Sequence, residues 1–322
     1  MGPVEISKCT NLVIKIYVIG YSSKGESIIV LFQDREDNSV LYTVVIDSFV
    51  YKNCNKTVEI LENYGIHAID LLCWSHPDED HTLGMDDIIT RFCNDLTKII
   101  LPYGVNGKDF DKIDYNQGDV GLVRKIIDLN EKRKRAHLTS CVTPPYFQPM
   151  AMVTFSDYPD QIDVQIHTLS PHSPLINERI GNGKKMKKNE LSIALYIKVE
   201  NYNFVFCSDI ENPTIDNIMA SCFDNPVFIK IPHHTSKTSD SLLNILKTDQ
   251  SNTLGCTTVY KQHGLPDEEL LERYEKVCTQ VHTTGTTEKE KPIFGVVEYS
   301  FSLYDVIPHV DIKCFGHAQR VS

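Results

Sequence analysis

The stretch AIDLLCWSHPDEDHTLG, residues 68–84, decides how this chain is expected to fold. Its first part, Ala68 to Trp74, is a short and continuous apolar run, which is typical of a buried strand. A polar loop follows, and then a helical pattern runs from Met85 to Cys93. Open α/β folds place their ligands where a buried strand gives way to a loop and a helix. We therefore expect an α/β protein with a site at this strand end.

The polar loop after this strand carries the densest group of candidate metal ligands. His76, Asp78, Asp80 and His81 fall within six residues. Neutral imidazole and carboxylate are both good ligands for divalent metals, and a tight loop can direct alternate side chains at two neighbouring ions. The alternative interpretation is an acidic turn on the surface.

Two more polar groups follow buried apolar runs further along the chain. Asp209 comes after Phe204 to Cys207, and the pair His233-His234 comes after Ile229 to Ile231. Alone, an Asp at a strand end is commonly a turn or cap residue, and adjacent histidines can be structural. Three such groups, each directly after a buried strand, support one another and predict a shared metal centre.

The remaining pattern predicts two β-sheets packed together with helices outside, within a single domain over residues 1–322. An insertion or lid is expected around 105–165, where the pattern is less regular. The expected strands are Leu12 to Val18 (half-buried), Ser27 to Phe32, Leu41 to Ile46, Asp163 to Leu169, Leu191 to Val199, Asn203 to Cys207, Val227 to Ile231, Thr257 to Tyr260 and a terminal one over Pro292 to Leu303; helices are expected over Lys56 to Tyr64, Val123 to Arg135 and Asp267 to Cys278.

Composition limits the classes of function. The formal charge is −11, from 32 Lys and Arg against 43 Asp and Glu, which argues against a broad basic face that coats nucleic acid. Two basic runs, 132–135 and 184–188, are either solvated loops or a rim that attracts phosphate. No apolar run is long enough to span a membrane. The ten cysteines form no C-x-x-C pair, so we expect reduced thiols and a cytoplasmic protein.

The loop at 75–84 resembles the metal-binding loop of the metallo-β-lactamase superfamily. It is most similar to the hydrolase domain of ComEC-type competence proteins, which carry Asp at the position of Asp78 where most members have His. The similarity is collinear over about residues 12–303. It includes the segments Val45 to Ser48, Asn189 to Leu195, Phe206 to Asp209, Ile229 to Ser239 (with Thr235 in place of Gly), Gly264 to Pro266 (with Leu265 in place of His) and Thr283 to Gly285.

The resemblance implies a four-layer αββα metallo-β-lactamase sandwich and a ligand set for one or two divalent ions, Mn or Zn. The first ion would use His76, Asp78 and Asp209. The second would use Asp80, His81, Asp209 and one of His233 and His234, of which the match favours His234. Most members also place a His on the loop before the bridging Asp, but Asn189 and Glu190 stand there in this chain. The first site is therefore expected to be weak. We expect His167 and His172, which lie further upstream, to be structural.

The resemblance further implies a phosphodiesterase or nuclease that acts on DNA or RNA through a metal-activated water. Asp80, His233 and Ser236 are the candidate catalytic residues, with His263 a further candidate for phosphate contact. Two alternatives stay open: a hydrolase of a small cyclic nucleotide, lactone or thioester, and a non-catalytic partner module. The chain has no membrane channel like that of the competence proteins, so their role in DNA uptake is not carried over. A protein partner and the oligomeric state stay undecided.

Overall fold

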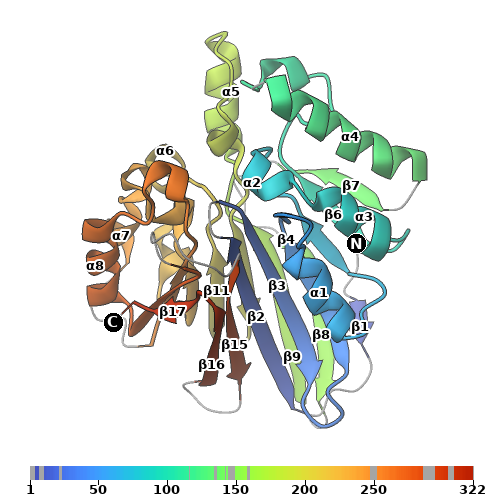
Figure 1. Cartoon of the computed structure of the whole chain (residues 1–322), viewed down its shortest axis with the longest axis vertical. Helices are drawn as coiled ribbons and strands as arrows, with labels where there is room; N and C mark the ends of the chain where they lie inside the picture. Colours follow the sequence, from blue (N-terminus) through green and yellow to red (C-terminus); the bar gives the residue numbers. More distant parts are fainter. Residues whose placement is uncertain are drawn as a thin grey trace.

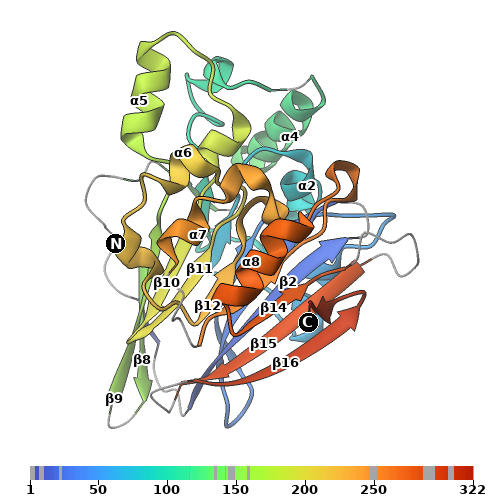
Figure 2. The ribbon, with the colours of Figure 1, turned by 90° about the vertical axis from the view of Figure 1, so that its left-hand side faces the viewer.

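The computed structural model of the chain describes residues 4–6, 11–21, 24–115, 117–133, 136–141, 143, 149–157, 160–246, 252–285, 294–303 and 308–321. Two mixed β-sheets pack against each other, and helices cover the outer face of each (Figures 1 and 2). The predicted four-layer αββα sandwich is therefore confirmed. The described part of the chain contains no helix long and apolar enough to cross a membrane.

The first sheet, here called sheet A, has nine strands among the described residues. In spatial order they are β1 (Val4–Ile6), β8 (Pro149–Asp157), β9 (Asp160–Thr168), β10 (Leu195–Val199), β11 (Tyr202–Phe206), β12 (Phe228–Lys230), β13 (Leu254–Thr257), β14 (Gln280–Thr283) and β17 (Gln319–Arg320). The pairs from β8 to β11 are antiparallel, and those from β11 to β14 are parallel. At the two edges, β1 pairs parallel with β8 and β17 pairs antiparallel with β14.

The second sheet, sheet B, has eight strands among the described residues. In spatial order they are β16 (His309–Gly316), β15 (Phe294–Ser302), β2 (Leu12–Tyr21), β3 (Glu26–Asp34), β4 (Val40–Ile46), β5 (Leu71–Cys73), β6 (Lys98–Leu101) and β7 (His137–Ser140). The strands from β16 to β4 are antiparallel, and those from β4 to β7 are parallel.

Helices and short 3₁₀ turns connect the strands. The α-helices are α1 (Lys56–Asn63), α2 (Glu79–Thr82), α3 (Met85–Phe92), α4 (Gln117–Arg133), α5 (Ser173–Gly181), α6 (Asn212–Ile215), α7 (Leu242–Ile245) and α8 (Glu268–Val277). The 3₁₀ turns are η1 (Phe110–Lys112), η2 (Lys188–Leu191), η3 (Ala220–Phe223), η4 (Pro232–Thr235), η5 (Lys237–Ser239) and η6 (Lys261–His263). Side-chain caps start two of these helices: Asn55 accepts from Val58 N at α1, and Asp267 accepts from Leu270 N at α8.

Strand β2 shows how the layers are assembled. Alternate side chains of a strand point to opposite faces. Leu12, Ile14 and Ile16 enter the core between the sheets, while Tyr17 and Ile19 enter the core between sheet B and the helices that cover it. The prediction that this strand is half-buried is therefore wrong, because both of its faces are covered. A third apolar core lies between sheet A and α6 to α8.

Several other sequence expectations need correction. Strand β13 ends at Thr257, so the expected strand over Thr257 to Tyr260 is shifted; Tyr260 instead forms an isolated bridge with Leu265. Strand β15 is not terminal, because β16 and β17 follow it. Helix α5 and strand β8 were not expected. The region at 105–165 contributes α4 and parts of both sheets, and its role as an insertion or lid stays a prediction.

The topology brings the site loops to one edge of the sandwich. Parallel strands end at the same edge of a sheet, so the loops after β4 and β5 lie together, as do those after β11, β12 and β13. A hydrogen bond joins the two sheets at this edge. It runs from Ile193 N, before β10 of sheet A, to the carbonyl of Ser75, after β5 of sheet B. The site is thus built on strand ends of both sheets.

Two glycines allow a close approach of the sheets at the same edge, where Gly20 pairs with Glu26. Gly20 in β2 and Gly295 in β15 are paired in register, and both face Thr284, which follows β14. A methyl group on Gly295 would overlap the carbonyl oxygen of Thr284. Backbone atoms cannot yield as a flexible side chain does, so a larger residue there must separate the sheets.

We predict that Gly295→Ala lowers the free energy of unfolding by about 1–3 kcal/mol, the usual cost of overpacking. The matched control is Gly181→Ala at the end of α5, because a methyl group there would meet open space. Urea unfolding of both variants measures the difference. Equal midpoints for Gly295→Ala and the control would contradict the close sheet contact.

Candidate metal centre

Three loops converge on the carboxylate of Asp209. This residue follows β11 and is buried with its Oδ2 atom 3.6 Å from His81 Nε2 and 3.6 Å from His234 Nε2. His76 Nε2 lies 3.8 Å from the same oxygen. The three imidazoles come from the loop after β5, from α2 and from η4, so elements of both sheets meet at one atom.

The two remaining carboxylates predicted from the sequence lie in the same cluster. Asp80 Oδ2 is 3.4 Å from His234 Nε2 and 3.7 Å from His81 Nε2. Asp78 Oδ2 is 3.4 Å from His76 Nε2. The structure therefore brings together all six residues that the sequence analysis named as metal ligands. Asp80, His81, Asp209 and His234 form a compact group of four, and His76 and Asp78 adjoin it.

Five buried polar atoms of this cluster lack hydrogen-bond partners among the described residues. They are His76 Nε2, His81 Nε2, His234 Nε2, Asp80 Oδ2 and Asp209 Oδ1. Burying polar atoms without partners is costly, and each such atom in a native protein calls for an explanation. Lone pairs of imidazole and carboxylate that converge on one point are the donor set of a divalent cation. The residues therefore fit a bound metal ion.

The far side of the His81 ring is held by Asp47, which follows β4. His81 Nδ1 lies 2.7 Å from Asp47 Oδ2, and the other oxygen of Asp47 accepts from Ser75 N at 2.7 Å. An ionised carboxylate only accepts, so the proton of the neutral imidazole stays on Nδ1 and the Nε2 lone pair points into the cluster. A carboxylate behind a ligating histidine is the usual support of a metal site.

His76 is oriented in the same sense by serine hydroxyls. Ser75 Oγ donates to Asp47 Oδ2 at 2.5 Å and accepts from Ser208 Oγ at 2.7 Å. Its remaining lone pair faces His76 Nδ1 at 3.0 Å, which therefore acts as the donor. Because Ser208 follows β11 of sheet A and Ser75 follows β5 of sheet B, this chain of hydrogen bonds ties the sheets together beneath the site.

His234 has a third support of different chemistry. Thr258 Oγ1 donates to Glu26 Oε2 at 2.5 Å and lies 2.8 Å from His234 Nδ1, so the ring donates to the hydroxyl. Glu26 is neutralised by Lys230, whose Nζ is 2.8 Å away and fully buried. Glu26 and Asp47 are near enough to the imidazoles to be counted among possible ligands. Both lie on the Nδ1 side and already have partners, so we assign them supporting roles.

The buried histidines and carboxylates of the cluster shift one another's pKa values. Burial alone would lower the pKa of His81, but the carboxylates of Asp209, Asp80 and Asp47 outweigh burial and raise it well above its usual value. The pKa of His234 is raised in the same way. Burial would raise the pKa of Asp209, yet the neighbouring histidines hold it well below its usual value. Without a metal, protons on the rings thus balance the buried carboxylates.

The backbone at the histidine pair is coiled into an uncommon conformation. His233, His234 and Thr235 have φ angles of 47°, 50° and 62°. Left-handed φ values are uncommon outside glycine, and a β-branched residue there is an outlier. Thr235, which replaces the Gly of the similar proteins, is secured by its hydroxyl, which donates to Thr257 Oγ1 at 2.7 Å. Strain of this kind gathers at functional sites.

A cleft of about 520 Å³ opens above the cluster. The predicted catalytic residues His233 and Ser236 lie in its wall, as does the exposed His263. His233 Nδ1 is 2.8 Å from Thr238 Oγ1, and its Nε2 is 3.4 Å from Asn189 Nδ2. His167 lies instead in β9, where it packs against Tyr196. His172 occupies the N-cap position of α5, without a side-chain hydrogen bond to the helix.

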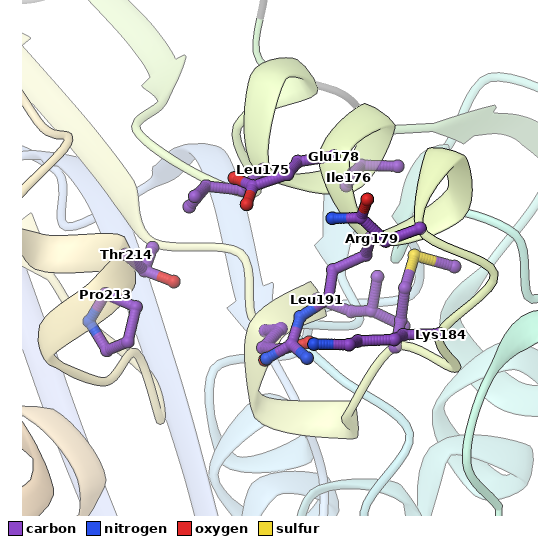
Figure 3. Close-up of a pocket in the computed structure, with 11 residues that line it drawn as sticks. Leu175, Ile176, Glu178, Arg179, Lys184, Leu191, Pro213 and Thr214 are labelled. Atoms are coloured by element: carbon purple, nitrogen blue, oxygen red, sulfur yellow. The ribbon is translucent and has the colours of Figure 1, made fainter.

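Of the two interpretations of the basic run at 184–188, each fits part of it. Lys188 lines the cleft beside Asp78, whereas Lys184 lines a separate cavity of about 320 Å³ between α5, η2 and α6 (Figure 3). Lys185 and Lys187 are exposed. The other basic run, at 132–135, lies outside the described side chains. Lys24 adds a second ammonium to the cleft wall, 2.7 Å from Glu79.

Comparison with known proteins does not identify a family for this chain. No protein-family model matches the chain, and no curated protein matches it significantly. Solved structures that match include the 1.98 Å crystal structure of Zn²⁺-bound PqqB from Methylobacterium extorquens, with 10% sequence identity and a TM-score of 0.36 over 67% of this chain and 71% of that chain. The description of the centre therefore rests on the geometry above.

The residues that sequence reasoning missed are those that support the ligands. Asp47 was noticed only as part of a matching segment, and Glu26, Thr258 and Lys230 were given no role. One signal was available: Lys230 is a single lysine inside a buried apolar strand, and a buried ammonium needs a partner.

We predict that Asp47→Asn weakens metal binding by about 10–100-fold, because the amide no longer holds the His81 ring in the same way. Asn also tolerates the positive φ of 57° at this position, so the backbone is preserved. The control is Asp70→Asn, whose carboxylate accepts from Thr43 N. Competition with a chromophoric chelator measures the affinity. Unchanged affinity would show that Asp47 does not support a ligand.

Metal binding is predicted to release protons and to strengthen as pH rises. Because its pKa is raised well above its usual value, His81 carries an extra proton near neutral pH in the metal-free protein, and the raised pKa of His234 increases the protonated fraction of that ring. A protonated ring must lose a proton to bind an ion. Affinity should therefore climb until pH exceeds these values and then level off. Calorimetry in buffers of different ionisation enthalpy counts the protons. Binding with no proton release at neutral pH would contradict the raised values.

Proposed function

We propose that the protein is a metal-dependent hydrolase that cleaves phosphodiesters with a metal-activated water. The observation that carries this proposal is the convergence of unpartnered Nε2 and carboxylate oxygen atoms at the floor of a cleft. A buried His/Asp/Glu cluster of this kind is consistent with divalent ions. A purely structural cluster would not need to open onto such a cleft.

Asp80, His81, Asp209 and His234 would hold the second ion, and His76, Asp78 and Asp209 would contribute to the position of the first. The carboxylate-rich donor set favours Mn²⁺ or a mixture of Mn²⁺ and Zn²⁺ more than an all-histidine set would. A bound ion supplies a hydroxide at neutral pH by lowering the pKa of its water towards about 7.

The residues of the cleft wall would bind the substrate and move the proton. His233 is half-buried, with its Nε2 4.0 Å from Asp209 Oδ2, so it reaches the edge of the cluster from the solvent side. It is our candidate to protonate a leaving alkoxide or to contact phosphate. Ser236 and His263 line the same wall and can donate to the non-bridging oxygens of a phosphate.

The proposed substrate is DNA or RNA, as in the competence-protein nucleases that the metal loop resembles. Lys24 and Lys188 lie in the cleft wall, but both are paired with carboxylates, so the bound ion would supply most of the attraction for an anionic substrate. One observation favours a smaller one. A cleft of about 520 Å³ falls within the range of about 300–1,000 Å³ that is common for small-molecule sites. Hydrolysis of a cyclic nucleotide or a related ester is therefore the second candidate.

We predict that Asp80→Ala lowers phosphodiester hydrolysis by at least about a hundredfold, since loss of a ligand should cost more than loss of a supporting residue. Hydrolysis of a chromogenic phosphodiester and of a labelled oligonucleotide with added Mn²⁺ measures the loss, and circular dichroism checks the fold. The control is Asp86→Ala in α3, which removes an exposed ion pair with Lys125. Equal activity in the Asp80 variant and the wild type would refute the assignment.

The same assay separates the candidate substrates. Nucleic acid binding releases counterions, so its affinity should fall steeply with salt, whereas a small ester should show a weak dependence. Turnover of cyclic nucleotides, lactones or thioesters with no cleavage of oligonucleotides would favour the second candidate. A protein that binds metal but hydrolyses none of these substrates would be a non-catalytic partner module.

A further inference from the structure

The position left by the missing histidine is filled by a lysine. On the loop before Asp209, Asn189 and Glu190 stand where the similar proteins carry a ligating His. Asn189 does not turn towards His76; its Nδ2 lies 3.4 Å from Glu211 Oε1 and 3.4 Å from His233 Nε2. The preceding residue, Lys188, instead brings its ammonium into contact with Asp78 Oδ1.

The ammonium of Lys188 is held from two sides. It pairs with Asp78 on one side and with Asp119 of α4, 2.9 Å away, on the other, and only 15% of the side chain is exposed. The second oxygen of Asp78 faces His76 Nε2. A positive charge therefore sits beside one of the three side chains that would have to bind the first ion.

The turn that carries Lys188 is also fixed. Glu190 accepts from the backbone N–H of Lys187 at 3.1 Å and pairs with Arg179 of α5. Figure 3 shows Arg179 reaching from α5 towards the turn that carries Leu191. The turn that presents Lys188 is thus held by an internal hydrogen bond and by an ion pair with α5.

We propose that Lys188 replaces the first metal ion, so that the protein binds a single divalent ion tightly, at Asp80, His81, Asp209 and His234. This inference deepens the proposed function and rests on its metal centre. The first position has only His76, Asp78 and the shared Asp209, one ligand fewer than the other position. At the effective dielectric of a partly exposed site, repulsion between an ammonium and a divalent ion a few ångströms away lowers affinity by at least about tenfold.

The charge balance supports the assignment. One divalent ion leaves the group of Asp78, Asp80 and Asp209 with a net charge of −1. Lys188, which also pairs with Asp119, supplies a positive charge beside Asp78. A second divalent ion would add its charge where the ammonium already lies. Removing the ammonium leaves Asp78 and the unpartnered His76 Nε2 free to accept an ion.

The test measures metal stoichiometry in three variants with Mn²⁺ as the probe. Calorimetry and elemental analysis count the ions, and electron paramagnetic resonance distinguishes an isolated Mn²⁺ from a coupled pair. Wild type should bind one ion, with any second ion at least about tenfold weaker. Lys188→Met should bind two, with a coupled spectrum. Lys188→Arg keeps the charge and should bind one, and the control Lys185→Met, an exposed residue of the same basic run, should behave as wild type.

Each other outcome overturns the inference. Two ions of similar affinity in wild type would show that the ammonium does not exclude one. A single ion in Lys188→Met, in a protein whose circular dichroism is unchanged, would do the same, as would two ions in Lys188→Arg. If Lys188→Met does not fold, Lys188→Gln takes its place with the same expected second ion. Zero ions in every protein would overturn the metal centre and the proposed function together, whereas one ion without hydrolysis would overturn the proposed function alone.

Discussion

The site depends on the burial of Asp209 between loops of both sheets. A carboxylate in that place is costly unless positive charge or hydrogen-bond donors surround it. Three imidazoles face it with their Nε2 atoms, and each ring is held from behind by a different partner: Asp47, Ser75 and Thr258. The orientation of the rings is therefore set by the fold and does not wait for a ligand.

The supporting groups explain why the centre is formed by strand ends. Asp47, Ser75 and Ser208 sit directly after β4, β5 and β11, and their hydrogen bonds run from one sheet to the other. The parallel parts of the sheets bring these ends to the same edge, where a short side chain is long enough to span the gap. Short side chains therefore suffice to support His76 and His81.

The sequence identified the residues of the cluster better than their surroundings. His76, Asp80 and Asp209 stand out because polar groups interrupt apolar strands at the points where chains in an α/β fold turn. Glu26 and Thr258 carry no such signal, since each stands next to other polar residues at the end of an apolar run and its role exists only through contacts across the sheets. Local pattern does not encode which strand ends become neighbours.

The same limit applies to particular elements of the fold. Long periodic segments such as α8 and β2 were located correctly, but β2 was expected to face water on one side, because a single Lys15 suggested alternation. That lysine reaches the hydroxyl of Tyr64 at the end of α1, which covers the sheet. Lys188 was hidden in the same way: within a run of lysines it has the pattern of a solvated loop, and only the tertiary contacts with Asp78 and Asp119 distinguish it.

The buried pair of Lys230 and Glu26 has a consequence for how the molecule moves. Lys230 belongs to β12 of sheet A and Glu26 to β3 of sheet B, and neither reaches solvent. Parting the sheets at this edge would strand two opposite charges in an apolar interior, so small breathing motions of the sandwich are opposed there. Local opening near the histidine loop therefore costs much free energy, so backbone amides there exchange slowly. The pocket for the cation persists as long as the protein stays folded.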